Sequence, residues 1–156
     1  MAQEIERKFL VQGDSWRSSA GAGKAYLQGY LCLDRERVVR VRVKDGRGFL
    51  TIKGLRVGIS APEFEYPIPL AEAEEMLQKL CLRPLIEKVR HEVRHEGLLW
   101  EIDEFQGDNL GLILAEVELE SEDQAVALPP WAGLEVSHDK RYANASLVQC
   151  PFGKWP

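Results

Sequence analysis

The chain has 156 residues, of which 45% are hydrophobic and 29% charged, a composition typical of one globular domain with its own core. Its formal net charge of -5 disfavours a general nucleic-acid or acidic-membrane binder, because such proteins usually carry a net basic surface. No apolar run approaches the ~18 residues of a membrane span, and the charged N-terminal stretch lacks the apolar core of a secretory signal. We therefore expect a single domain over residues 1–156 that binds neither nucleic acid nor a membrane.

The three cysteines, Cys32, Cys81 and Cys150, are an odd and widely spaced set. This pattern fits reduced thiols better than a disulfide framework. We therefore expect a cytoplasmic protein. The sequence does not fix the oligomeric state and leaves a homodimer open.

Alternating polar and apolar residues predict a chain made mainly of strands. The first strand is QEIERKFLV at residues 3–11, followed by a Gly/Ser-rich loop at 12–25 with a short helix around Trp16. Later segments are rich in β-branched and aromatic residues, which favour strands. They are predicted, in chain order, at residues 26–33, 38–44, 48–53, 63–68, 86–95, 98–105 and 112–120.

Helices are predicted at only a few places. Pro69 opens one of them, and Leu70, Ala73, Leu77 and Leu80 form its apolar stripe, with acidic residues in its first turns. Two shorter helices are predicted at residues 122–128 and 142–148. Many strands with few helices predict an α+β, mostly antiparallel β fold, either a barrel or a sandwich with helices at its margins.

Charged residues recur at alternate positions of nearly every predicted strand, and they are bunched by sign. They are Glu4, Glu6, Lys8, Arg40, Arg42, Lys53, Glu63, Glu65, Lys88, Arg90, Glu101, Asp103, Glu116 and Glu118. Alternation places each set on one face of its strand. A solvated face is the simple interpretation for any single strand, but solvated faces tend to intersperse the two signs. If the sheet closes, these faces line a wet tunnel, because burying so many ions without water would cost several kcal/mol each.

The two signs of this lining predict two kinds of ligand. The basic residues suit a polyanion with many oxygens, because arginine matches phosphate geometry and lysine supplies a point charge. The acidic residues suit Mg²⁺ or Mn²⁺ rather than zinc, because carboxylates are hard oxygen ligands. The basic set is Lys8, Arg40, Arg42, Lys53, Lys88 and Arg90, and the acidic set is Glu4, Glu6, Asp103, Glu116 and Glu118. A small-molecule polyphosphate with its bound metal satisfies both.

The order of these residues resembles the triphosphate tunnel metalloenzymes, the CYTH domain family. The Glu-x-Glu-x-Lys motif of the family is EIERK at residues 4–8, and the match continues through residues 28–31, 40–42, 50–53, 63–66, 87–90, 101–105, 116–119 and 141–144. It covers nearly the whole chain. After Glu135 and Val136 the family commonly has Thr where this chain has Ser137, which keeps the hydroxyl. The resemblance implies an eight-stranded closed antiparallel tunnel, metal-dependent cleavage of triphosphates and residence in the cytoplasm.

Within this family, the chain looks most like the short bacterial inorganic triphosphatases, which implies cleavage of triphosphate to pyrophosphate and phosphate. As a hypothesis, the basic set holds the substrate, and the acidic set holds one or two divalent ions. The expected catalytic residues are Glu4, Glu6, Lys8 and Lys88, with Glu63, Glu65 and Tyr30 in supporting roles.

Other functions of the same tunnel stay open. Thiamine triphosphatases and class IV adenylyl cyclases share it, and a binding module could grip polyphosphate without chemistry. Such a module would not need Glu4, Glu6, Glu116 and Glu118 together, since those acids oppose a bare polyanion.

Two short motifs indicate different chemistry but fit less well. Gly21–Lys24 hints at a phosphate loop, yet Ser18 and Ala25 occupy places that the motif gives to Gly and to Ser or Thr. HEVRH at residues 91–95 matches the zinc-peptidase motif, which requires a helix. The apolar spacing leaves a helix open here. On a strand, the two histidines would lie roughly 13 Å apart, too far to share one ion.

Overall fold

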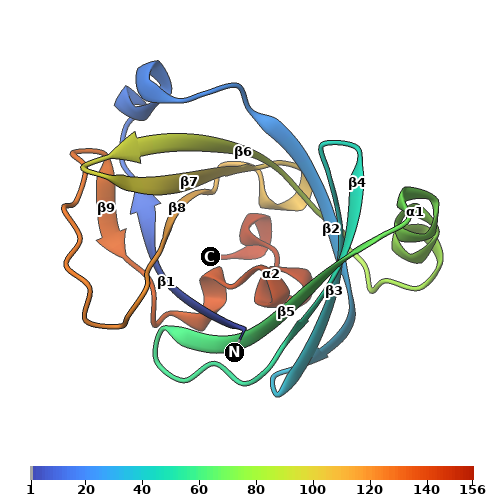
Figure 1. Ribbon diagram of the computed structural model, residues 1–156. Helices are drawn as coiled ribbons and strands as arrows, with labels where there is room; N and C mark the ends of the chain where they lie inside the picture. The colour runs from blue at the N-terminus through green and yellow to red at the C-terminus, as the bar shows by residue number, and fades with distance from the viewer. Residues whose placement is uncertain (1) are drawn as a thin grey trace.

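The computed structural model describes residues 2–156, in which nine strands form one sheet that closes on itself (Figure 1). The strands are β1 (Gln3–Val11), β2 (Lys24–Asp34), β3 (Arg37–Lys44), β4 (Arg47–Lys53), β5 (Ser60–Ile68), β6 (Ile86–His95), β7 (Leu98–Phe105), β8 (Ile113–Glu118) and β9 (Ala132–Glu135). Their order is β5-β4-β3-β2-β6-β7-β8-β1-β9, and β5 also pairs with β1. The ring of β1 to β8 confirms the predicted eight-stranded closed antiparallel tunnel.

Strand β1 closes the ring because it divides its pairing between two neighbours. Its first residues, 3–5, pair with residues 60–62 of β5, and its next residues, 6–10, pair with residues 114–118 of β8. The short strand β9 then pairs with the end of β1, at Phe9 and Val11. The sequence did not predict β9, since four residues after two prolines carry too little alternation to be recognised.

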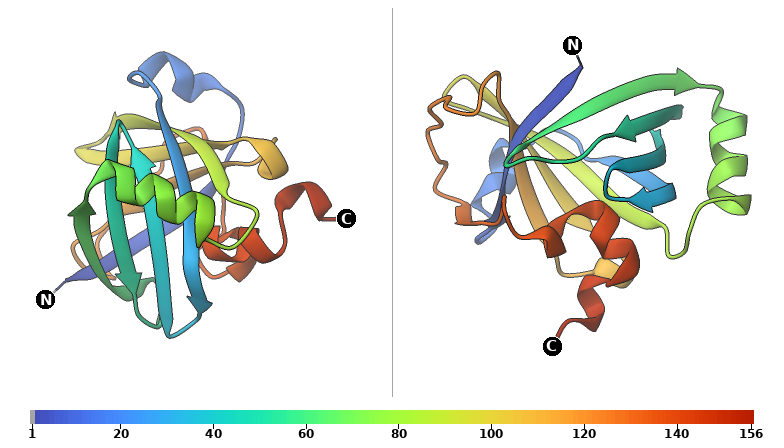
Figure 2. Two further views of the ribbon diagram at one scale, coloured as in Figure 1. Left: turned by 90° about the vertical axis from the view of Figure 1, so that its right-hand side faces the viewer. Right: turned by 90° about the horizontal axis from the view of Figure 1, so that it is seen from below.

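Helix α1 (Leu70–Lys79) lies outside the ring, across β2, β3 and β4 (Figure 2, left). It confirms the helix predicted after Pro69, and it buries Ala73 and Leu77 against Val41. Gly48 of β4 permits this close approach, because a Cβ there would come within 2.7 Å of the Ala73 Cβ. The predicted stripe was wrong at Leu80, which follows the end of the helix and is 64% exposed.

The remaining helical segments are short. They are η1 (Ser15–Ser19), η2 (Gly107–Asn109), η3 (Lys140–Tyr142), α2 (Asn144–Gln149) and η4 (Phe152–Lys154). The first of them confirms the short helix predicted around Trp16, whose side chain is buried. The expected helix at 142–148 is therefore split into a 3₁₀ turn and a shorter α-helix. Every helix in residues 2–156 is too short or too polar to span a bilayer.

The helix predicted at residues 122–128 was wrong, because this segment has no helical structure. Side chains at its start bond locally instead. Gln124 Oε1 accepts from the Glu120 N–H at 2.7 Å, and Ser121 Oγ donates to Asp123 at 2.8 Å. Such bonds compete with helix formation, and the prolines at 129 and 130 favour an extended chain before them.

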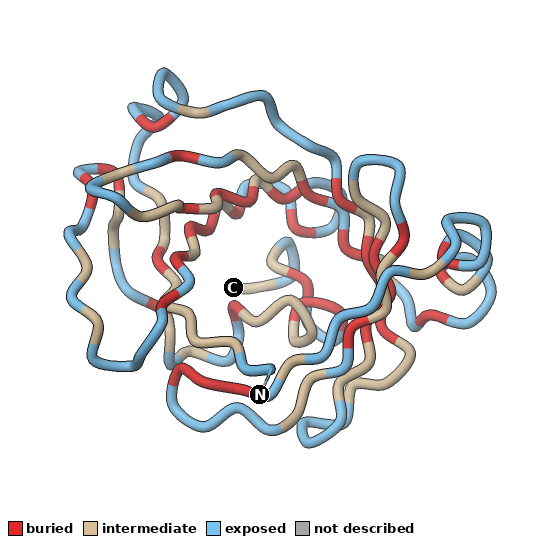
Figure 3. The backbone as a smooth tube through the Cα atoms, in the orientation of Figure 1, coloured by how far each residue is buried: buried red, intermediate tan, exposed pale blue. Residues whose placement is uncertain are grey.

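The apolar side chains form three clusters, two of them on the outside of the ring. One lies under α1, and another joins Phe9, Trp16, Trp100 and Trp131 outside β1, β7 and β8. Figure 3 shows buried positions along the ring strands and in α2, whereas much of the surrounding loop is exposed. The outward faces are therefore covered, which leaves the charged faces inside.

The third cluster closes one end of the ring. Ile86, Phe105 and Leu114 point inward, each two residues from a charged residue of its strand, and they pack with Leu147 of α2. Figures 1 and 2 (right) show the C-terminal segment across this end. The tunnel is thus charged in its middle and apolar where α2 seals it.

We expect Leu147→Ala to lower the free energy of unfolding by about 2–5 kcal/mol, because it opens a cavity in a fully buried cluster. Leu134→Ala is the control, since Leu134 on β9 is 70% exposed. Urea unfolding of both variants measures the difference. Equal stability of the two variants would contradict the sealing role of Leu147.

Candidate active site

The ring encloses a cavity of about 650 Å³ lined by nearly all of the charged residues that the sequence analysis selected. The predicted site residues among its lining are Glu4, Glu6, Lys8, Tyr30, Arg40, Arg42, Lys53, Glu63, Glu65, Lys88, Arg90, Glu116 and Glu118. Only Asp103 of the predicted set is absent from this lining, because it lies behind Lys88 and Arg90. The structure thus brings together residues from seven strands: β1 to β6 and β8.

Strand register sets acids and bases side by side in the tunnel. On β1 and β8, Glu6 lies opposite Glu118 and Lys8 lies opposite Glu116. The Lys8 ammonium is 3.6 Å from Glu116. An acidic region therefore forms where β1 meets β8, and a lysine borders it.

Glu4 and Glu6 are neighbours on one face but differ in their electrostatic environment. Glu4 accepts from Lys53 at 3.1 Å and from Arg56 at 2.8 Å. Burial opposes its ionisation. The positive charge of Lys53, a hydrogen bond with Glu63 and the positive charge of Arg56 together outweigh burial and lower the pKa of Glu4 to about 2. Burial and the nearby Glu116 and Glu4 instead raise the pKa of Glu6 to about 8. Like charges this close do not readily ionise together.

The donor set of the acidic region fits a hard divalent cation. The groups that it offers to a cation are all carboxylates. Burial raises the pKa values of Glu6 and Glu118, and the neighbouring acids raise them further. Across residues 2–156, no group of three or more His, Cys, Asp or Glu side chains is arranged so that it could hold a metal ion by itself. A Mg²⁺ site needs only one or two carboxylates when water and substrate phosphates supply its other ligands.

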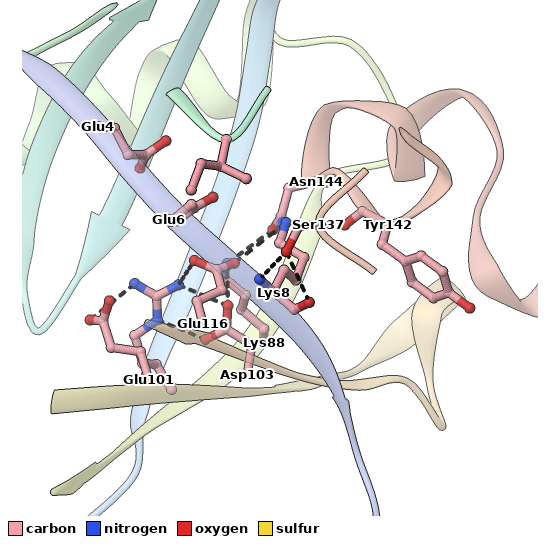
Figure 4. A network of polar contacts seen from close by, with 12 residues as sticks. Glu4, Glu6, Lys8, Lys88, Glu101, Asp103, Glu116, Ser137, Tyr142 and Asn144 are labelled. Atoms are coloured by element: carbon pink, nitrogen blue, oxygen red, sulfur yellow. Dashed lines mark hydrogen bonds and ion pairs between the residues drawn. The ribbon is translucent and has the colours of Figure 1, made fainter. Parts of the chain in front are cut away.

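Asp103 holds two of the predicted substrate cations (Figure 4). Its carboxylate is 1% exposed and accepts from Arg90 Nε at 2.7 Å, from Arg90 Nη2 at 2.8 Å and from Lys88 Nζ at 2.8 Å. Burial lowers the pKa of Lys88 to about 7, with Asp103 opposing the shift and Arg90 and Arg42 adding to it. Both Asp103 oxygens are thus engaged by cations.

Arg42 and Arg40 are buried cations of the tunnel whose partners differ: Arg40 has an ion pair with Glu65, and Arg42 has a neutral amide. Each is 6% exposed. Arg42 Nε donates to Gln28 at 2.8 Å, and Arg42 forms no ion pair with any residue in the described range 2–156. Burial, together with Arg40 and Arg90, lowers its pKa to about 10. Arg40 contacts Thr51 at 3.1 Å and Glu65 at 3.4 Å, while its buried Nε has no partner in that same range.

Unpaired buried guanidinium groups are unfavourable unless an anion neutralises them. The donors of Arg40 and Arg42 face a cavity that also holds Lys53 and Lys88. This side of the tunnel therefore presents several cationic donors to any bound molecule, and Arg42 is the one of these four that has no ion pair in residues 2–156. Phosphate oxygens match such donors in both charge and geometry.

The supporting residues hold these cations in place. Glu65 accepts from Thr51 at 3.0 Å as well as from Arg40, and Glu63 lies 3.2 Å from Lys53. The Tyr30 hydroxyl accepts from Gln28 at 3.1 Å.

Sequence analysis gave no role to four residues that contact this network: Gln28, Thr51, Arg56 and Asn144. Gln28 and Thr51 share the tunnel-facing parity of their strands but are uncharged, so a search for charge alternation passes over them. Arg56 lies in the loop between β4 and β5, and Asn144 begins α2, where strand parity gives no signal.

The two competing motifs lie in settings that do not suit their chemistry. HEVRH belongs to strand β6, where His91 bonds Glu104 at 3.1 Å and packs on Trp16. The helix that a zinc peptidase requires is therefore absent at residues 91–95. Lys24 of the other motif begins strand β2, whereas a phosphate loop leads into a helix.

Comparison with known proteins identifies the class of this protein. Residues 2–149 match the family model of the CYTH domain, and the chain belongs to the CYTH domain family.

Relatives of the whole chain are named inorganic triphosphatase. One, from Acetivibrio thermocellus, is 49% identical over 152 residues, which are 97% of each chain. Another, from Nitrosomonas europaea, is 38% identical over 149 residues, 93% of this chain and 96% of the relative. A crystal structure of the inorganic triphosphatase NE1496 is 36% identical, with a TM-score of 0.66 and coverage of 92% of this chain and 96% of that one.

We expect Arg90→Met and Arg42→Met to affect stability differently in the absence of triphosphate. Arg90→Met breaks a buried ion pair with Asp103 and should cost about 3–5 kcal/mol of unfolding free energy. Arg42→Met removes a cation without an ion pair and should cost far less. Urea unfolding measures both, and equal losses would show that Arg42 has a compensating partner.

Proposed function

We propose that this protein hydrolyses inorganic triphosphate to pyrophosphate and phosphate inside the tunnel, with a divalent metal. The observation that carries the proposal is Arg42, a buried arginine without an ion pair in residues 2–156, which lies beside the buried Arg40 in a tunnel that also contains an acidic region. The names of the relatives from Acetivibrio thermocellus and Nitrosomonas europaea support the choice of substrate.

In the proposed complex, the basic side chains bind the phosphate chain along the tunnel. Arg40 and Arg42 supply planar groups of donors, and Lys8 and Lys88 supply ammonium groups beside the acidic region. These groups are held before substrate arrives, so they stabilise charge that develops on the transferred phosphoryl group without reorganising. Lys53 and Arg90 complete the proposed substrate set.

The proposed metal ligands are Glu4, Glu6, Glu116 and Glu118, and the proposed ion is Mg²⁺ or Mn²⁺. When bound, the ion would neutralise charge on the phosphate oxygens and lower the pKa of an attacking water. Asp103 was placed in the metal set from sequence. Because its oxygens accept from Arg90 and Lys88, we now propose that it orients these two cations beside the metal.

We also propose a cytoplasmic location. The cysteines Cys32, Cys81 and Cys150 are all free thiols in the structure, which supports the expectation of a reducing compartment. A small-molecule triphosphate remains the proposed partner, because the convergent charges lie inside the ring rather than on its outer surface.

The test of this function is phosphate release by the purified protein from inorganic triphosphate, thiamine triphosphate and ATP, each with Mg²⁺, Mn²⁺ or EDTA. We expect metal-dependent release that is fastest from inorganic triphosphate. Preference for thiamine triphosphate, or formation of cyclic AMP from ATP, would instead assign one of the other activities of this fold. Binding without turnover of any substrate would indicate a non-catalytic polyphosphate binder.

Glu4→Gln keeps the size of the side chain but removes its charge. We expect turnover to fall about 100-fold or more, because a weakly held metal would no longer neutralise the charge that develops on the phosphate oxygens in the transition state. Mn²⁺ affinity, measured by titration calorimetry, should fall with it. Glu74→Gln on the exposed outer face of α1 is the control. Near-normal turnover and metal binding in Glu4→Gln would remove Glu4 from the site.

A further inference from the structure

Asn144, the first residue of α2, connects the C-terminal segment to the cations of the tunnel (Figure 4). Its Oδ1 accepts from Lys88 Nζ at 2.9 Å and from Gln28 Nε2 at 3.3 Å. The same segment accepts from Lys8, whose Nζ lies 3.4 Å from the Tyr142 carbonyl oxygen. The segment that seals one end of the tunnel thus also touches two lysines proposed to bind substrate.

The orientation of these amides follows from their neighbours. Arg42 is a donor only, so the Gln28 oxygen faces it and the Gln28 amide N–H groups face Tyr30 and Asn144. Asn144 must then present its oxygen to both Gln28 and Lys88. Only this orientation of the two amides gives every donor an acceptor, so each hydrogen bond of the network has a fixed donor and a fixed acceptor.

Hydrogen bonds join Arg42, Gln28, Asn144, Lys88 and Asp103 in one continuous network. At its far end, Asp103 accepts from Arg90. Gln28 is fully buried, and Asp103 and Lys88 are nearly so. Hydrogen bonds in such a low-dielectric setting are stronger than in water. Three cations that face the cavity are therefore held by three connecting residues, of which Asn144 alone belongs to the C-terminal segment.

Lys88 depends on Asn144 for its direction. A lysine ammonium is a point charge on a flexible stem, and one acceptor restrains it only loosely. Among residues 2–156, its hydrogen-bond acceptors are Asp103 on β7 and Asn144 on α2. Without Asn144, the ammonium would keep only its bond to Asp103, deeper in the wall and next to Arg90.

We propose that Asn144 is a positioning residue, which holds the Lys88 ammonium toward the bound triphosphate and links docking of α2 to the arrangement of the tunnel cations. This inference rests on the proposed triphosphatase function. It predicts that Asn144 acts through Lys88 rather than through general stability.

A double-mutant cycle tests this dependence, with Asn144→Ala, Lys88→Met and the double variant. In the wild-type background, we expect Asn144→Ala to lower kcat/KM for inorganic triphosphate about tenfold, as for the loss of a hydrogen bond to a charged group. In the Lys88→Met background, the same change should lower it by less than about twofold. Gln149→Ala is the control, because Gln149 lines the cavity from α2 but forms no side-chain hydrogen bond among residues 2–156.

A second readout needs no substrate. The ¹⁵N–¹H NMR signal of the Lys88 ammonium, assigned by its loss in Lys88→Met, should be sharp in wild type and in Gln149→Ala, and broadened in Asn144→Ala. If wild type shows the sharp signal but does not hydrolyse triphosphate, the proposed function fails while the positioning role stands. Equal losses of kcat/KM from Asn144→Ala in both backgrounds, or an unchanged signal, would overturn the positioning role.

Discussion

The buried contact of Asp103 with Arg90 and Lys88 is the interaction on which the tunnel lining depends. Two cations that face the same cavity would repel each other, and burial would drive Lys88 toward its neutral form. A single carboxylate, held by β7 directly beside β6, opposes both effects. Because Asp103 is itself buried, this arrangement is stable only while all three groups remain together.

The charged groups inside the ring explain why the barrel has its apolar clusters on the outside and at one end. A small closed sheet normally fills its interior with apolar side chains, but here charged side chains line a cavity in the middle. Apolar burial must then come from the outward faces, under α1, under η1 and under the 119–131 segment. The inward apolar cluster around Leu147 is confined to the end that the C-terminal segment covers.

The alternation of side chains along each strand predicted most of the charged residues that line the tunnel. Charged residues two apart on a strand must share a face, and a one-residue shift in register would turn them all outward. This is why the lining could be predicted for a closed sheet, whereas the closed eight-stranded ring itself was predicted from the resemblance to the CYTH domain family. The pattern could not reveal how those charges pair. Asp103 looked like a metal ligand because its side chain is acidic, and only the spatial neighbourhood of Arg90 and Lys88 gives it a different proposed role. Gln28 and Asn144 lacked a signal because neutral amides stand out only once their partners are known.

The unequal compensation of the cations is the final link between the fold and the proposed chemistry. Arg90 has a full carboxylate partner, whereas Arg42 has only the neutral Gln28 amide. A protein selected for stability alone would gain by pairing or removing Arg42. In the proposed function, an unpaired guanidinium whose direction is fixed by Gln28 would be ready for an anion and would not need to reorganise when the anion binds. The cost of burying the charge of Arg42 and the proposed affinity of the tunnel for a polyanion therefore have the same physical origin.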